Sequence, residues 1–196
     1  MRRAFAALVV ACALVACGGD SEREPAGFRR DPAPNVGDFS LPDIAAGGRE
    51  QPFRAEPGGL LVVYFGYTNC PDVCPTTLAD LRAALDRIDG AERVDVAMVT
   101  VDPDRDTAVL ADYVGGFFDR GHALATDDPG RLAQVAAPFG VTYEVTEDDD
   151  GEVAVSHTPW LYAVDDDGVL ALTWPFATEV DDLAADLEML LEEADA

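Results

Sequence analysis

Two cysteines spaced four residues apart are the residues of this sequence best suited to chemistry. Cys70 and Cys74 follow the apolar run 60–65, which is typical of a buried strand, and precede a helical pattern that begins near Pro75. Residues four apart in a turn or helix can face the same side, so both sulfurs can reach one ligand. The amino end of a helix also stabilises a thiolate, which is the form that binds metals or attacks disulfides. Two soft thiolates favour a soft ion, with copper(I) as the leading candidate.

One of the two histidines in the sequence could complete such a site. His157 lies far along the chain from the cysteines, between two segments that we predict to be strands. Its imidazole would give a trigonal site of two sulfurs and one nitrogen, which suits copper(I), and copper(II) with added oxygen ligands. A lone histidine is more often an ordinary polar residue at a strand end. We interpret His122 in that way, because it has no ligand-like neighbour in the sequence.

The segments around these residues alternate between strand and helix patterns. This order predicts an α/β fold with a mixed central sheet flanked by helices, and a thioredoxin-like fold fits it. Short segments on either side of Gly47-Gly48 predict an N-terminal β-hairpin. We expect one domain over residues 37–196. The predicted strands are 60–65, 94–101, 122–125, 141–145, 152–155, 160–164 and 169–174, and the helical patterns start at Pro75, Val109, Leu132 and Val180.

The beginning of the chain has the features of an export signal. Two arginines precede the uncharged apolar run Ala4–Ala16, which is short for a permanent membrane-spanning helix but suits a secretory signal. The run leads into Leu14–Cys17, which resembles the bacterial lipobox, where the signal is cut before a cysteine that then carries lipid. We therefore predict a lipoprotein signal peptide over residues 1–17, lipidation of Cys17, and an extracytoplasmic protein anchored to a bacterial membrane. An ordinary cleaved signal is the alternative.

Composition and net charge indicate a tether and exclude one class of binding partner. Residues 18–36 are rich in Asp, Glu, Arg, Pro and Gly, which predicts a flexible tether. The chain carries 38 acidic against 13 basic residues, a net charge of −25, and such a surface repels nucleic acid. Of the four cysteines, Cys12 would leave with the signal and Cys17 would be lipidated. Cys70 and Cys74 are then partners to each other or to a bound species.

Three segments resemble the Sco (SenC) family, in the same order. Residues 65–78 resemble the family's cysteine signature, residues 101–107 its Val-Asp-Pro segment, and residues 156–168 its histidine segment. The resemblance covers roughly residues 35–194 and implies a thioredoxin fold.

The same resemblance implies a function and a ligand set. Proteins of this family bind copper through two cysteines and a histidine, which implies Cys70, Cys74 and His157 as ligands of Cu(I) or Cu(II). Asp102 is a candidate nearby carboxylate. The implied function is that of a copper metallochaperone in assembly of the CuA centre of cytochrome c oxidase, by copper delivery, thiol reduction or both. The implied partner is the oxidase subunit that carries CuA, or another copper protein.

The alternative function is an extracytoplasmic thiol–disulfide oxidoreductase or peroxiredoxin-like reductase that uses Cys70 and Cys74 without metal. That function does not need His157, and thioredoxin-like reductants typically have two residues between their cysteines, not three. We therefore favour the metallochaperone over an enzyme.

Two departures from the family pattern bear on this choice. Asn69 stands where many relatives carry histidine, and Pro159 stands where an aliphatic residue is common. Because thioredoxins carry a cis-proline facing their cysteines, Pro159 is a candidate cis-proline.

Overall fold

The apolar run that begins at Leu60 forms the central strand of the molecule. In the computed structural model, which describes residues 23–195, every residue of this strand is buried. The strand pairs in parallel with β4 and antiparallel with β8, within a mixed sheet of seven strands. In spatial order the strands are β2 (Arg49–Pro52), β1 (Ser40–Asp43), β5 (Gly121–Leu124), β4 (Val94–Thr100), β3 (Leu60–Gly66), β8 (Leu161–Val164) and β9 (Leu170–Trp174).

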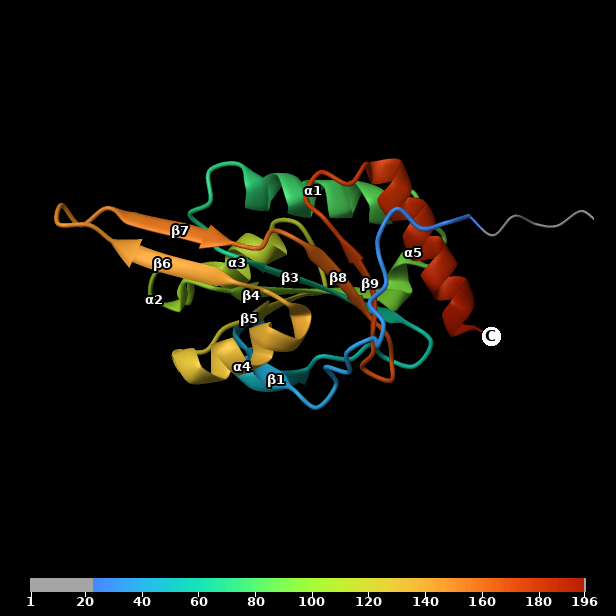
Figure 1. The fold of residues 1–196 in the computed structure, drawn as a ribbon, viewed down its shortest axis with the longest axis horizontal. Coiled ribbons are helices and arrows are strands. Elements are labelled where there is room, and N and C mark those ends of the chain that lie inside the picture. The colour runs from blue at the N-terminus through green and yellow to red at the C-terminus, as the bar shows by residue number, and fades with distance from the viewer. Residues whose placement is uncertain (1–22, 196) are drawn as a thin grey trace, which may run out of the picture.

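Helices cover both faces of this sheet (Figure 1). The side chains of β3 alternate between the faces, as a strand requires. Leu60, Val62 and Tyr64 pack with α1, α3 and α5, whereas Leu61 and Val63 pack with α4 on the other face. The helices are α1 (Val73–Leu85), α2 (Pro103–Asp106), α3 (Leu110–Gly115), α4 (Pro129–Phe139) and α5 (Val180–Ala194). The predicted α/β class, its mixed sheet and the N-terminal β1–β2 hairpin are confirmed.

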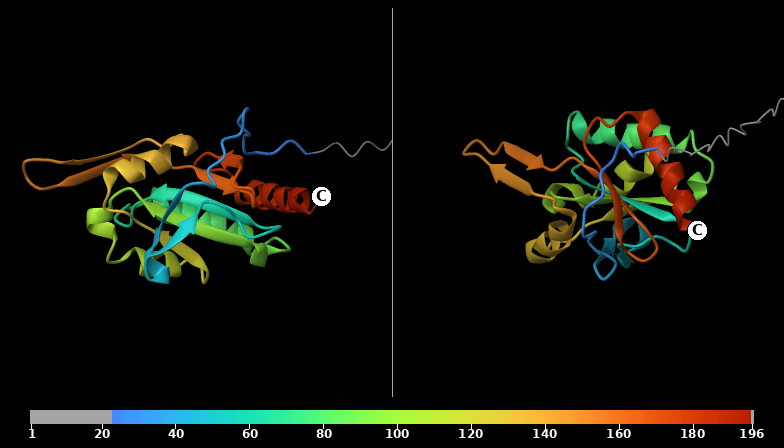
Figure 2. Two further views of the ribbon diagram at one scale, coloured as in Figure 1. Left: turned by 90° about the horizontal axis from the view of Figure 1, so that it is seen from below. Right: turned by 45° about the vertical axis from the view of Figure 1, so that its right-hand side comes forward.

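A second, smaller sheet extends away from the main body (Figures 1 and 2). It consists of β6 (Tyr143–Glu147) and β7 (Val153–His157), which pair only with each other among the described strands. The register places Tyr143 opposite His157 at the base of this hairpin. The hairpin therefore holds the predicted histidine at the end that joins the main sheet.

The tether predicted over residues 18–36 is wrong for its larger part. From Arg23 onward the segment runs along β9, which it joins through paired backbone hydrogen bonds between Phe28 and Thr173 of 2.9 and 3.0 Å. Further along, the Val36 amide donates to Gly168 at 2.7 Å, and the Val36 side chain is fully buried. Composition did not predict this, because the attachment is made mainly by backbone groups at the edge of the sheet and needs few apolar side chains.

The predictions made for the start of the chain fall on residues that the structure does not describe. The signal peptide over residues 1–17, the lipidation of Cys17 and the first part of the tether lie outside the range 23–195. Within that range, none of the helices combines the length and apolar character needed to span a bilayer.

Candidate metal centre

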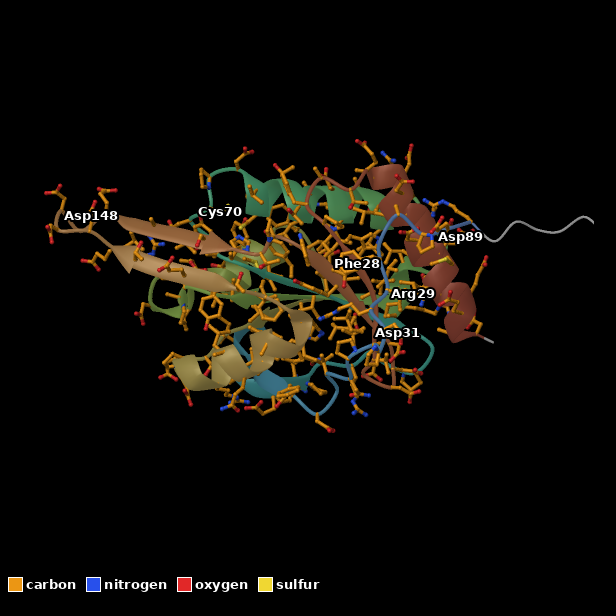
Figure 3. The ribbon with its side chains drawn as sticks, viewed as in Figure 1. Phe28, Arg29, Asp31, Cys70, Asp89 and Asp148 are labelled. Carbon is orange, nitrogen blue, oxygen red and sulfur yellow. The ribbon has the colours of Figure 1, made fainter. Side chains whose placement is uncertain are left out.

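The two cysteines lie where the central strand passes into α1, and Figure 3 labels Cys70 there. Cys70 belongs to the connecting loop and Cys74 is the second residue of the helix. The Cys74 amide donates a hydrogen bond of 3.2 Å to the Cys70 sulfur, so the start of the helix acts directly on that thiol. Gly66 makes room for the second sulfur, because a Cβ at this position would lie 3.2 Å from Cys74 Sγ and 2.5 Å from Tyr64 Cε1. Neither cysteine forms a disulfide.

Folding brings His157 to this pair from 83 residues away in the chain. Its Nε2 lies 3.6 Å from Cys74 Sγ, while its Nδ1 lies 3.2 Å from the Thr158 carbonyl oxygen. If Nδ1 carries the proton and donates it to that carbonyl, the lone pair of Nε2 faces the sulfur, as a metal-binding histidine requires. The rings of Tyr64 and Tyr67 stand edge-on to the imidazole, with centroids 6.0 and 5.8 Å away. The imidazole is therefore held from two sides.

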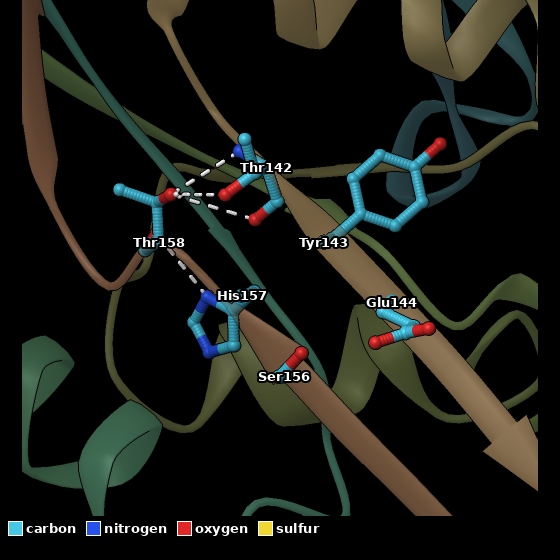
Figure 4. Close-up of a pocket in the computed structure, with 6 residues that line it drawn as sticks. All are labelled: Thr142, Tyr143, Glu144, Ser156, His157 and Thr158. Carbon is cyan, nitrogen blue, oxygen red and sulfur yellow. Dashed lines mark hydrogen bonds between the residues drawn. The ribbon is translucent and has the colours of Figure 1, made fainter.

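An open pocket of about 520 Å³ lies beside the imidazole at the base of the hairpin (Figure 4). Its other lining residues come from the facing ends of β6 and β7 and from the threonines that adjoin them. Thr158 is tied to Thr142 by a backbone hydrogen bond of 2.9 Å, which fixes the end of β7, where the histidine sits. One side of the site is thus accessible from outside.

The two thiols differ sharply in acidity. Burial raises the pKa of the Cys74 thiol to about 12, because the buried surroundings disfavour its charged form. Burial also opposes ionisation of Cys70, but hydrogen bonds to its sulfur, first of all from the Cys74 backbone, outweigh it and lower the pKa. Burial lowers the pKa of His157, so its imidazole is neutral at neutral pH and able to bind a metal. The site combines a reactive thiol, a buried thiol and a neutral imidazole.

These donors fit a soft ion by their chemistry, but they do not yet form a closed cage. Over residues 23–195, no three His, Cys, Asp or Glu side chains are already arranged to hold a metal ion. Cys74 and His157 are in contact, and Cys70 is directed at the Cys74 amide. Binding therefore requires an adjustment, and the partly exposed Cys70 is better placed to make it than the buried Cys74.

Comparisons with known proteins identify the family of this chain. The family model described as SCO1/SenC matches residues 29–192. The chain belongs to the SCO1/SenC family. It is 36% identical over 129 residues to the mitochondrial protein SCO1 homolog 1 of Arabidopsis thaliana, covering 64% of this chain and 38% of that protein. It is also 36% identical over 146 residues to the mitochondrial SCO2 homolog of Bos taurus, covering 71% and 53%. The chain thus spans about two fifths to one half of the length of these relatives.

Solved structures of the SCO1/SenC family have the same fold. The solution structure of apo Sco1 from Thermus thermophilus has a TM-score of 0.72 at 31% identity, covering 87% of this chain and 99% of that one. Copper-bound ScoI of Arabidopsis thaliana has a TM-score of 0.70 at 28% identity, covering 81% and 99%. Copper-bound ScoI of Bradyrhizobium japonicum has a TM-score of 0.65 at 30% identity, covering 77% and 96%. The predicted thioredoxin-like fold and family are confirmed.

The carboxylate connected to the cysteine loop of this SCO1/SenC chain is Asp106, which was not predicted from the sequence. Asp102, the predicted candidate, is buried and bonded to Arg105 Nε at 2.5 Å. Asp106 is fully buried and accepts hydrogen bonds from the amide and hydroxyl of Thr68 at 2.9 and 2.5 Å, and from the Thr100 hydroxyl at 2.6 Å. Because Thr68 lies two residues before Cys70, Asp106 fixes the loop that presents the thiol.

Three other residues singled out in the sequence have different outcomes. The bond before Pro159 is not cis, since the one cis peptide among the described residues precedes Pro32. The extended chain that leads from β7 into β8 passes through Pro159 in the ordinary trans form. Asn69 is exposed. His122 does have a polar neighbour, because its Nδ1 lies 2.8 Å from a carboxylate oxygen of Asp43, on strands β5 and β1.

Proposed function

We propose that this chain binds copper through Cys70, Cys74 and His157 and acts as a metallochaperone in assembly of the CuA centre of cytochrome c oxidase. The observation that carries the proposal is the 3.6 Å approach of His157 Nε2 to Cys74 Sγ. A dithiol reductant does not require an imidazole at that position. Two SCO1/SenC relatives of the same fold, from Arabidopsis thaliana and Bradyrhizobium japonicum, have been solved with copper bound.

Copper is the cargo in this proposal, and the three ligands play unequal parts. Two thiolates satisfy copper(I), and the neutral imidazole adds the nitrogen that copper(II) prefers. Cys74 is buried beneath the site, whereas Cys70 is partly exposed in its loop. An acceptor's ligand therefore reaches the metal from the side of Cys70. Replacement of Cys70 by that ligand begins the transfer, and the copper ion is never released into water.

A thiol–disulfide oxidoreductase is the second candidate, and the lowered pKa of Cys70 favours it. The Cys70 thiolate would attack a disulfide of the partner and form a mixed disulfide. Cys74 would then displace the partner's sulfur, leaving a Cys70–Cys74 disulfide and two thiols on the partner. The raised pKa of Cys74 slows this second step, because the thiolate is the attacking form.

The two candidate functions are separated by one variant. His157→Ala, loaded with copper(II), the ion that depends most on the imidazole, would be mixed with the soluble CuA-bearing domain of the oxidase subunit, in its metal-free form. Copper in the acceptor would be measured over time. A metallochaperone loses copper transfer in this variant but still reduces a disulfide in the same acceptor. If the variant transfers copper as wild type does, the metallochaperone assignment of His157 is wrong.

We also propose that Cys17 carries lipid and anchors the protein on the extracytoplasmic side of a bacterial membrane. The support is the sequence Leu14–Cys17 after an apolar run. Cys17→Ser should leave uncleaved precursor or released protein in a fractionation experiment. Mature, membrane-bound Cys17→Ser protein would contradict the anchor.

A further inference from the structure

Three tyrosine hydroxyls are buried without any hydrogen-bond partner in the part of the chain from 23 to 195: those of Tyr64, Tyr113 and Tyr162. A buried hydroxyl that lacks a partner costs about 1–3 kcal/mol of stability, so each one calls for an explanation. One of the three lies beside the candidate copper ligands.

Tyr64 is fully buried on β3, and its polar neighbours are Cys74 and Thr77 of α1. The ring lies so close to the Cys74 sulfur that a glycine is needed between them, since a Cβ at position 66 would meet both. The Thr77 hydroxyl already donates to the Val73 carbonyl at 2.8 Å. The Thr77 oxygen keeps its lone pairs and can also accept, so the Tyr64 hydroxyl has two neighbouring acceptors. Of these two, only the Cys74 sulfur gains acceptor strength when copper binds.

A thiol sulfur is a weak acceptor, whereas a thiolate bound to a metal carries negative charge and accepts hydrogen bonds well. Copper binding removes the Cys74 proton in a place that is closed to water, because the side chain is fully buried. The negative charge that then forms on the Cys74 sulfur needs a hydrogen-bond donor that is already in position. Tyr64 meets this requirement from one side, while its ring edge-on to His157 holds the imidazole on the other.

We infer that Tyr64 is a positioning residue of the copper site, whose hydroxyl donates a hydrogen bond to the Cys74 sulfur once copper has replaced its proton. The inference rests on the proposed copper binding by Cys70, Cys74 and His157. It assigns the buried hydroxyl a partner that the thiol state lacks. The chain then carries an unsatisfied group in its apo form that is satisfied when copper binds.

The test compares Tyr64→Phe with Tyr162→Phe, which removes an equally buried and equally unpartnered hydroxyl. Tyr162 lies on the opposite face of the sheet, among Phe65 and Phe139. Removing a hydroxyl that has no hydrogen-bond partner does not destabilise the apo protein. Both variants should therefore unfold at or above the wild-type urea midpoint. Tyr64→Phe should then bind copper(I) roughly tenfold more weakly, while Tyr162→Phe binds like wild type.

Spectroscopy adds a readout that a packing role would not change. Hydrogen bonding to a thiolate lowers the energy of its lone pairs and raises the copper reduction potential. The sulfur-to-copper(II) absorption of Tyr64→Phe should therefore move to longer wavelength and its reduction potential should fall. An unchanged band and affinity would overturn the inference, as would a loss of apo stability in Tyr64→Phe alone. If wild type itself binds no copper, the proposed function fails and the inference falls with it, whereas copper binding shared equally by all three proteins refutes only the role of Tyr64.

Discussion

Two buried polar clusters in this molecule differ in how completely their hydrogen bonds are satisfied. Asp186 of α5 is fully buried, and its carboxylate accepts from Arg23 Nη1 at 2.6 Å, the amides of Ala26 and Gly27 at 3.2 and 2.9 Å, and Trp174 Nε1 at 2.9 Å. The cluster around Cys74 is equally buried, but its neutral thiol meets one imidazole and an unpartnered tyrosine hydroxyl.

The difference separates a structural cluster from a functional one. A completed cluster around Asp186 ties the N-terminal segment to the C-terminal helix, and nothing further needs to bind there. An incomplete cluster costs stability, and a ligand that completes it removes that cost. The dithiol site has that character, since its donors come together but leave the Tyr64 hydroxyl unsatisfied.

The largest expected effect is the loss of the completed cluster. Asp186→Ala leaves the indole of Trp174 and the amides of Ala26 and Gly27 without their acceptor, and should lower the free energy of unfolding by about 3 kcal/mol. Urea denaturation measures this. Asp182→Ala is the matched control, because its half-exposed carboxylate pairs with the same Arg23 and should cost less than about 0.5 kcal/mol. Equal, small losses in both variants would mean that the segment behaves as the tether its composition predicts.

Within the proposed copper site, the two cysteines should react at very different rates. The lowered pKa of Cys70 means that its thiolate appears below the usual range, whereas the Cys74 thiolate forms only near pH 12. At pH 8, Cys70 should be alkylated roughly fiftyfold faster than Cys74, after allowing for the lower nucleophilicity of the more acidic thiol. Mass spectrometry of the reduced, folded protein follows both sites. The same protein in denaturant should show equal rates, and equal rates in the folded state would refute the asymmetry.

A smaller effect is expected at the carboxylate that fixes the cysteine loop. Asp106→Asn replaces one acceptor oxygen by an NH₂ group that faces hydrogen-bond donors. This variant should lower the free energy of unfolding, measured by urea denaturation, by about 2 kcal/mol. Because the Thr68 amide and hydroxyl then lose part of their support, copper(I) affinity should fall as well. Asp102→Asn is the control, since the bond of Asp102 is to Arg105 and not to the loop. If Asp102→Asn weakens copper binding while Asp106→Asn does not, the original prediction from the sequence was correct.

The sequence predicted the strands, helices and site residues whose side-chain types indicate burial or chemical reactivity. The run Leu60–Phe65 is typical of a buried strand, and the helical pattern after it placed Cys70 and Cys74 where a strand gives way to a helix. His157 was predicted as a ligand because a thiolate pair lacks a third ligand and because the segment around it resembles a known family. The chemical character of these side chains is visible in the sequence itself.

What the sequence did not predict depends on backbone contacts and on the orientation of single turns. The edge pairing of Phe28 with Thr173 uses amides and carbonyls, which every residue has. Asp102 and Asp106 occur in the same acidic segment, and only the turn of α2 decides which of them reaches Thr68. The orphaned hydroxyl of Tyr64 has no sequence signal at all, because a buried tyrosine on a strand is usually satisfied.

Copper titration of the reduced chain from residue 18 onward tests the central claim most directly. Wild type should bind copper(I) and copper(II) tightly, and Cys70→Ser or Cys74→Ser should abolish tight binding of both. His157→Ala should weaken copper(II) most and copper(I) less, because two thiolates can hold copper(I) linearly. His122→Ala, which removes only the contact with Asp43, should bind both ions like wild type. Wild-type binding of both ions by His157→Ala, or a requirement for His122 instead, would contradict the account.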